Sequence, residues 1–226
     1  TFSQIKYIPA PLSGEQIINH LGYSLSYNEL HEQPNWIFYE LNKYKISGSA
    51  KRKNQFKIDP NVKKGSAELI DYRGSGYDRG HLAPAGDMKW SEIAMQESFF
   101  MSNISPQYPG FNRGIWKKLE AQVRKWSKNR SVYIVTGGIL KENLTTIGPN
   151  QVSVPKFFYK VIIAKEEFPL NGIGFVLPNK KSSKKLRDFA VSIDDVEELS
   201  GLDFFYLLPD TIEDRLESTF NYDYWS

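Results

Sequence analysis

An arginine and a histidine stand two positions apart in a glycine-rich stretch of the chain, at Arg79 and His81. Arginine is permanently charged and forks onto phosphate oxygens, and histidine can accept a proton near neutral pH. Gly74, Gly76 and Gly80 remove side chains around the pair, which would let backbone or a bulky polyanion come close to His81. The pattern predicts a centre that processes phosphate. The alternative is a hydrogen-bonded core histidine beside a surface arginine.

Further along the chain, residues 111–126 have the spacing of an amphipathic helix. The apolar positions are Ile115, Leu119, Val123 and Trp126, and the charged positions are Arg113, Lys117, Glu120 and Arg124. Asn112 would lie in the first turn of this helix and Glu120 about two turns on, so both could face one site beside the glycine-rich stretch. A solvated charged face with an N-terminal capping asparagine is the alternative.

These motifs together resemble the DNA/RNA non-specific endonuclease family. The resemblance rests on the tetrad Asp78-Arg79-Gly80-His81, followed at characteristic spacings by Ser102-Asn103-Ile104, by Asn112-x-Gly114-x-Trp116 and by Leu119-Glu120. The run Asp71-Tyr72-Arg73-Gly74-Ser75-Gly76 resembles the endonuclease G branch of the family in particular. Further matching segments extend the resemblance over most of the chain.

The resemblance implies a fold and a set of residue roles. The implied fold is α+β, a mixed β-sheet core with flanking helices and a ββα-metal motif that holds one metal ion. By position, His81 resembles the general base, Asn112 the direct metal ligand and Glu120 the carboxylate that holds metal-bound water. Arg79 resembles a residue that positions phosphate, and Asn103 an orienting asparagine. The family cleaves both DNA and RNA and leaves 5′-phosphate ends.

The chemistry of the residues favours Mg²⁺ as the cofactor, with Mn²⁺ as a substitute. Mg²⁺ keeps several of its waters, so one amide oxygen and a carboxylate acting through water form a suitable site. Zinc is disfavoured because the chain has no cysteine and only three histidines. Arg113 stands where the family commonly has glutamine, and its charge could grip a flanking phosphate or weaken cation binding.

The composition indicates one compact domain over residues 1–226 and a polyanionic partner. With 226 residues and 40% hydrophobic content, the chain can bury one substantial core. The net charge is only +3, but basic pairs and triplets recur, and each alone is more typical of solvated surface. A groove lined by several would attract nucleic acid. Arg52, Arg113 and Arg124 are the candidate substrate-binding residues.

The residue pattern supports the α+β class directly. Runs rich in aromatic and β-branched residues predict strands at 23–27, 36–41, 132–136, 157–164 and 172–177. A helix is expected to begin at Ser91 and run toward Phe100. Ser192 and Asp195 form a capping-box pattern at the start of another helix, which would run through Leu199.

The expected partners are DNA and RNA as substrates, and no association with a membrane is expected. A homodimer and a protein inhibitor are both compatible with the sequence. A binding-only descendant of the nuclease fold is a rival hypothesis, but it would have lost His81, Asn112 or Glu120. A second rival hypothesis is a small-molecule phosphatase, which would release inorganic phosphate from nucleotides. The chain opens at Thr1, and a secreted or periplasmic protein is the expected location, with mitochondria as the alternative.

Overall fold

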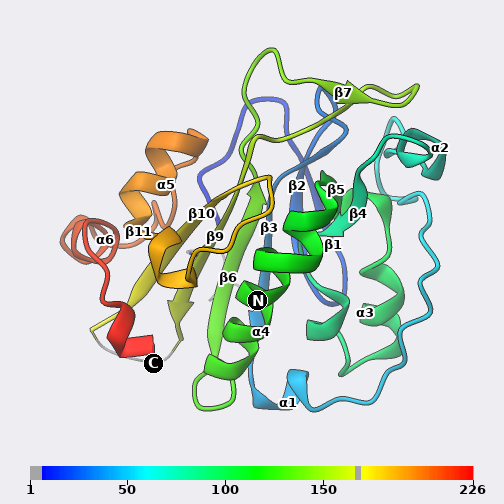
Figure 1. Cartoon of the computed structure of the whole chain (residues 1–226). Coiled ribbons are helices and arrows are strands. Elements are labelled where there is room, and N and C mark those ends of the chain that lie inside the picture. Colours follow the sequence, from blue (N-terminus) through cyan, green and yellow to red (C-terminus); the bar gives the residue numbers. More distant parts are fainter. Residues whose placement is uncertain (1–6, 166–168, 226) are drawn as a thin grey trace.

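The computed structural model describes residues 7–165 and 169–225, which form an α+β fold around a seven-stranded sheet (Figure 1). The strand order is β1-β2-β3-β6-β9-β10-β11, and each neighbouring pair is antiparallel. The strands are β1 (Gln16–Asn19), β2 (Ser24–Asn28), β3 (Gln33–Leu41), β6 (Val132–Gly138), β9 (Phe157–Ala164), β10 (Gly172–Pro178) and β11 (Ala190–Val191). All five strands expected from the sequence are present. The α+β class with flanking helices is therefore confirmed.

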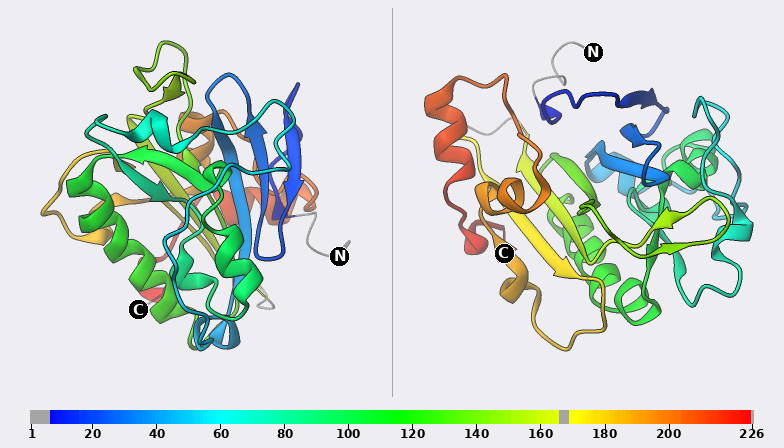
Figure 2. Two further views of the ribbon diagram at one scale, coloured as in Figure 1. Left: turned by 90° about the vertical axis from the view of Figure 1, so that its right-hand side faces the viewer. Right: turned by 90° about the horizontal axis from the view of Figure 1, so that it is seen from above.

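The helices cover both faces of this sheet (Figure 2). They are α1 (Lys43–Ile46), α2 (Leu69–Tyr72), α3 (Glu92–Glu97), α4 (Lys117–Trp126), α5 (Ile193–Ser200) and α6 (Asp210–Glu217). Two further antiparallel ribbons lie outside the main sheet, β4 (Asp78–His81) with β5 (Ile104–Gln107), and β7 (Thr146–Ile147) with β8 (Val152–Ser153). Among the described residues, no helix is both long and apolar enough to cross a bilayer.

Each face of the sheet carries its own hydrophobic core because side chains alternate along the strands. On one face, Leu119 and Trp126 of α4 pack with Phe158 and Ile162 of β9. On the other face, side chains of α5 and α6 pack with Tyr159, Val161 and Ile163 of the same strand. Lys160 falls in the row that faces α4, and it is fully buried there.

Local capping signals set two of the helix ends. The Ser91 side chain accepts a hydrogen bond from Ala94 N, which begins α3 where the sequence predicted it. At α5, Ser192 and Asp195 form the predicted capping box, and Gly201 ends the helix in a left-handed conformation with φ of 74°. Both helix starts could therefore be read from the sequence.

The β4–β5 ribbon and α4 form the ββα motif, with a kink that the sequence analysis did not predict. The expected single helix is divided into a π-helical turn, Phe111–Trp116, and α4. Gly114 breaks the helical geometry with φ of −105° and ψ of −108°. Asn112 therefore lies in the turn before α4 rather than in its first turn. Because of this break, regular helical spacing no longer fixes the direction of the Asn112 side chain relative to that of Glu120.

Candidate active site

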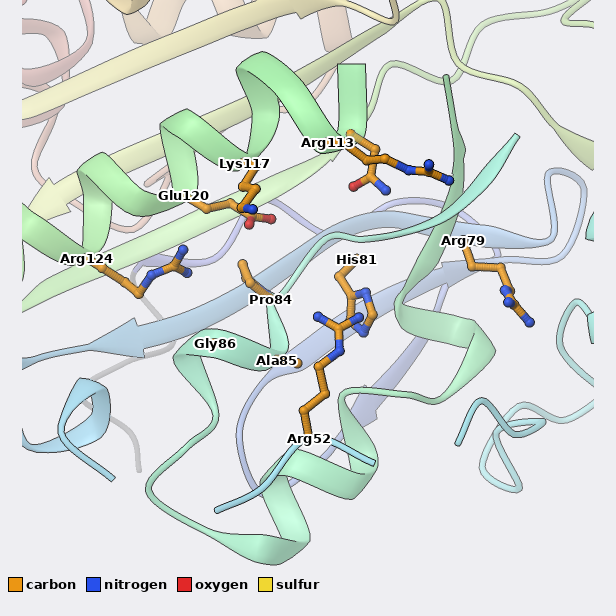
Figure 3. A pocket seen from close by; sticks show the side chains of 11 residues that line it. Arg52, Arg79, His81, Pro84, Ala85, Gly86, Arg113, Lys117, Glu120 and Arg124 are labelled. Carbon is orange, nitrogen blue, oxygen red and sulfur yellow. The ribbon is translucent and has the colours of Figure 1, made fainter. Parts of the chain in front are cut away.

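A cavity of about 480 Å³ lies between the β4 strand and the exposed side of α4 (Figure 3). Lys117, Glu120 and Arg124 reach from α4 toward the segment that follows His81. The cavity collects seven of the eight site residues named from the sequence: Arg52, Arg79, His81, Asn112, Arg113, Glu120 and Arg124. Only Asn103 is not among its lining residues. Side chains from three separate segments thus meet where the motif predicted a site.

His81 is held between two phenylalanine rings at the end of β4. Its ring lies 4.9 Å from the ring of Phe99, edge-on, and 5.6 Å from that of Phe56. The backbone carbonyl of His81 accepts a hydrogen bond of 3.3 Å from Trp116 Nε1, which links the strand to the turn before α4. Burial, and secondarily the positive charge of Arg52, lowers the pKa of His81 to about 3. The imidazole is therefore neutral at pH 7.

The Nε2 atom of His81 is buried and has no hydrogen-bond partner within the described part of the chain. Buried polar atoms are nearly always paired, so Nε2 is an exception. Because Nε2 is enclosed, Nδ1 is the ring nitrogen that is open to the cavity lined by His81. A neutral ring nitrogen without a hydrogen of its own can accept a proton. His81 is thus equipped to take a proton from a molecule in the cavity.

Gly80 serves packing within the ribbon rather than access to His81. A Cβ atom at this position would lie 2.1 Å from the side chain of Gln107 on the neighbouring strand β5. Of the close approaches expected at the glycines, the one at Gly80 is therefore made by the neighbouring strand of the protein itself. Gly74 and Gly76, in contrast, have positive φ and open surroundings, as turn glycines do.

Asp78 fixes the orientation of Asn112. The Nδ2 atom of Asn112 donates a hydrogen bond of 2.8 Å to Asp78 Oδ2, across from β4 to the π-helical turn. An amide whose nitrogen is engaged in this way presents its carbonyl oxygen in the other direction. Because Asn112 also lines the cavity, that oxygen is the group it offers there. Its side chain does not cap the helix, which excludes the alternative weighed from the sequence.

Arg113 binds the same carboxylate from the other side. Its Nε donates to Asp78 Oδ2 at 2.8 Å and its Nη2 to Asp78 Oδ1 at 2.6 Å, a bidentate arrangement. These bonds, with that of Asn112, hold the pKa of Asp78 below its usual value although burial opposes them. Arg113 therefore neutralises an aspartate at the cavity edge, while its side chain remains 73% exposed.

Glu120 lies at the cavity wall above a buried lysine. Burial raises the pKa of Glu120 to about 7, and the ammonium group of Lys160 opposes this rise most strongly. Lys160 is fully buried, and its Nζ has no hydrogen-bond partner among the described residues. The Nζ lies 4.9 Å from the centre of the Trp116 ring, and burial lowers the lysine's pKa. The pKa of the Glu120 carboxyl thus lies near neutral pH, under the influence of the buried positive charge of Lys160.

Arg124 is anchored to a second buried carboxylate. Its Nη1 lies 2.6 Å from Asp87 Oδ1, and the other oxygen of Asp87 accepts a hydrogen bond of 3.0 Å from the hydroxyl of Tyr39. Burial raises the pKa of Asp87, and the Arg124 guanidinium opposes the rise. This pairing holds the guanidinium at the cavity end that is remote from Arg113.

Arg52 and Arg79 flank the histidine through the two phenylalanines. The guanidinium of Arg79 lies 4.5 Å from the centre of the Phe56 ring, and that of Arg52 lies 5.2 Å from the centre of the Phe99 ring. Such stacking positions a guanidinium through its flat face. Nε of Arg52 also donates a hydrogen bond of 2.6 Å to Asn54 Oδ1, so its terminal nitrogens are the donors that remain. Both arginines are exposed, so their donors can reach an anion in the cavity.

The side chain of Asn103 lies behind the residues that line the cavity. Its Nδ2 donates to the carbonyls of Ala83 at 2.9 Å and Ser98 at 2.8 Å, and its Oδ1 accepts from Ala83 N at 2.9 Å. The side chain is fully buried. Asn103 thereby ties the segment just after His81 to the end of α3, which matches an orienting rather than a reacting group.

The donor set of the cavity fits Mg²⁺. The amide oxygen of Asn112 and the carboxylate of Glu120 are hard oxygen ligands, and the neighbouring cations disfavour a site built from many carboxylates. A group of three carboxylates that could hold a metal lies elsewhere, on the opposite side of the sheet, at Asp194, Glu197 and Glu217. The sequence reasoning missed that group.

It also missed Asp78, Asp87, Lys117 and Lys160 as parts of the site. Asp78 had a signal, since it opens the tetrad on which the resemblance rests. Lys160 had one too, because it interrupts an apolar run, 157–164, whose two faces are both buried. A lysine in such a run requires a charged or aromatic partner. Lys117 had a signal as well, because it lies on the same charged helix face as Arg113, Glu120 and Arg124. Asp87 had no comparable signal.

The ribbon, the turn and α4 around this cationic cavity define a ββα-metal fold and site. The family model described as DNA/RNA non-specific endonuclease matches residues 3–211. The chain belongs to this family. The likeness to the endonuclease G branch is also confirmed, because the mitochondrial nuclease EXOG of Xenopus laevis is 38% identical over 213 residues, which are 86% of this chain.

Two further comparisons agree. The mitochondrial nuclease of Saccharomyces cerevisiae is 36% identical over 228 residues and is covered over 68% of its length. The crystal structure of a complex of EndoG with EndoGI, described as explaining EndoG inhibition, superposes with a TM-score of 0.78 at 33% identity. The superposition covers 86% of this chain and 87% of the other. The chain spans 60% of the Xenopus EXOG sequence, so it corresponds to part of that protein.

Proposed function

We propose that this chain is a metal-dependent endonuclease that hydrolyses phosphodiester bonds in DNA and RNA without regard to base sequence. The observation that carries the proposal is the neutral His81 ring, which lines one cavity with the amide oxygen of Asn112. The first is suited to accept a proton and the second to bind a cation. Metal-assisted hydrolysis of a phosphodiester uses both.

In the proposed reaction, Nδ1 of His81, the ring nitrogen that is open to the cavity, takes a proton from a water molecule, and the resulting hydroxide attacks phosphorus. The bond from phosphorus to the 3′ oxygen breaks, which leaves a 5′-phosphate and a 3′-hydroxyl after the leaving oxygen gains a proton from water. Asn112 would hold Mg²⁺ directly and Glu120 would hold it through a bound water; the ion when bound supplies positive charge to the phosphate and the leaving oxygen. Arg79 and Arg52, which both line the cavity, would position the phosphate through their guanidinium groups.

Base sequence should matter little. The cavity is lined by five cationic side chains, Arg52, Arg79, Arg113, Lys117 and Arg124, which can bind the phosphates of any base sequence. Arg113 and Arg124 each form an ion pair with an aspartate. We therefore assign them a part in the electrostatic potential of the cavity as well as in substrate contact. Sequenced fragment ends from a mixed DNA should carry no strong consensus.

The relatives bear on location and partners. EXOG and the yeast enzyme are named as mitochondrial nucleases, which supports the alternative compartment named from the sequence rather than export. We therefore propose a mitochondrial location. The EndoG structure was solved with an inhibitor, EndoGI, which supports a protein inhibitor for this chain as well. A homodimer remains a prediction.

The test is incubation of the purified protein with circular DNA and with RNA, in Mg²⁺ or in chelator. We expect both nucleic acids to be fragmented in Mg²⁺ only. The fragments should carry 5′-phosphates, so a kinase should label their 5′ ends only after a phosphatase has removed these phosphate groups. Release of inorganic phosphate from nucleotides, without cleavage of the circular DNA, would instead support a phosphatase and overturn the proposal.

A further inference from the structure

A second hollow adjoins the candidate active site at Arg124. This groove, of about 490 Å³, lies between α1 and the C-terminal half of α4, and we call it the α1–α4 groove. Its charged lining residues are Lys43, Arg124, Lys125 and Lys128, all of them cationic. Arg124 lines both hollows, so the groove continues the cavity beyond Glu120 along α4.

The spacing of residues along α4 produces this continuity. Lys117, Ala121, Arg124 and Lys128 follow one another at the intervals of four, three and four that place side chains on one helix face. Lys128 extends the stripe past the end of the helix, because its N donates to Lys125 O at 3.3 Å and continues the turn. With a rise of about 1.5 Å per residue, the stripe covers about 16 Å.

The lysines of the groove are free to meet an anion. Lys43, Lys125 and Lys128 are exposed, and none has an ion pair with a described acidic residue. Arg124 differs, since Asp87 holds it in place. A duplex places one phosphate of each strand about every 3.4 Å along its axis, so the stripe is long enough to meet more than one phosphate of a bound strand. The small side chain of Ala121 leaves room for a backbone between the charges.

We propose that the α1–α4 groove binds the sugar-phosphate backbone of the nucleic acid that continues beyond the cleaved bond. The inference rests on the proposed function, because it is the substrate in the cavity that would lead its strand into the groove. Lys43 and Lys128 contact phosphates on the two sides of the groove. The protein therefore holds long substrates more tightly than the cavity alone would.

The test measures binding of a fluorescent 20-nucleotide single strand in chelator, over a series of salt concentrations. The double variant Lys43→Gln/Lys128→Gln should bind about tenfold more weakly at 50 mM salt, and the slope of log affinity against log salt should fall by about 1.4. The control Lys63→Gln/Lys118→Gln removes the same charge at exposed positions outside the groove, one of them on α4 itself. It should change both quantities far less.

Equal weakening in the two double variants would overturn the proposal, since net charge alone would then explain binding. So would an unchanged slope in the groove variant. Circular dichroism establishes that both variants fold. Because binding is measured without metal, its outcome is separate from that of cleavage: a protein that binds through the groove but cleaves neither DNA nor RNA in Mg²⁺ contradicts only the proposed function.

Discussion

Asp78 accepts a hydrogen bond of 2.8 Å from the side-chain amide of Asn112, and the bond joins the β4 strand to the turn before α4. The two residues are 34 positions apart, so only the packing of the ββα motif brings them together. Without this bond the amide could rotate and turn its nitrogen toward the cavity. Asp78 thus decides which atom of Asn112 a cation would meet.

Replacing Asp78 with alanine should therefore weaken metal binding more than substrate binding. Partners that orient a metal ligand typically contribute about 10- to 100-fold in metal affinity. We expect the Mg²⁺ concentration for half-maximal cleavage to rise by about that factor in Asp78→Ala, and activity should recover at high Mg²⁺. Titration of cleavage rate with Mg²⁺ measures this. An unchanged Mg²⁺ requirement would mean that Asn112 needs no such support.

His81→Ala should fold and lose most of its activity. A positioned base contributes about 10²- to 10⁴-fold to the rate, and no other described residue of the cavity offers a neutral ring nitrogen. Affinity for a 20-nucleotide strand in chelator should stay close to that of the original protein, because the cationic side chains remain. Single-turnover rates and circular dichroism check both parts. Near-normal cleavage by the folded variant would remove His81 from the mechanism.

The rate should fall as the pH drops below neutrality, because Glu120 must be ionised to hold metal-bound water. Burial raises the pKa of Glu120 to about 7, so the charged form is lost as the pH falls through that value. His81, with its pKa lowered to about 3, stays neutral throughout this window. Mg²⁺ favours the ionised carboxylate, so more Mg²⁺ should move the acidic limb to lower pH.

Rate profiles at several Mg²⁺ concentrations, for the original protein and for Glu120→Gln, test this assignment. The variant should be slower, and it should lack the acidic limb because its amide does not titrate. If Glu120→Gln keeps the same limb at the same pH, another group is responsible.

Lys160→Met should move that limb to higher pH. The buried ammonium of Lys160 is the strongest influence that favours ionised Glu120, so its loss leaves burial less opposed and raises the carboxyl's pKa further. A charge of opposite sign nearby typically shifts a pKa by about one unit or more. A purely structural lysine would change the rate at every pH equally. Lys160→Arg, which keeps the charge, is the matched control and should keep the limb near its original position.

Asn103→Ala should lower stability and activity together. Its three hydrogen bonds are buried, and each partner left unsatisfied costs about 1 to 3 kcal/mol. Urea unfolding should therefore show a loss of several kcal/mol, with a smaller loss of activity under conditions where the variant stays folded. A variant of normal stability that no longer cleaves would place Asn103 in the chemistry itself.

Features that depend on neighbouring residues could be read from the sequence. The start of α5 follows from Ser192 and Asp195, and β9 follows from an apolar run whose bounds the structure reproduces. The gathering of His81, Asn112 and Glu120 in one cavity was also predicted, but through the family resemblance rather than through periodicity.

Features that depend on packing could not be read in the same way. No proline in the sequence indicates the kink at Gly114, and a glycine alone is compatible with a continuous helix. The pairing of Arg113 with Asp78 requires knowledge of which strand lies beside the turn. Lys160 reaches Glu120 only because β9 presents that row of side chains to α4, a matter of sheet register.

The most direct test of the account is the location of a bound metal. Crystals soaked in Mn²⁺, a substitute for Mg²⁺ with a strong anomalous signal, should show a peak about 2.2 Å from the amide oxygen of Asn112. Water bound to that ion should approach Glu120. A peak at the carboxylates of Asp194, Glu197 and Glu217, with none at Asn112, would contradict the assignment of the catalytic metal.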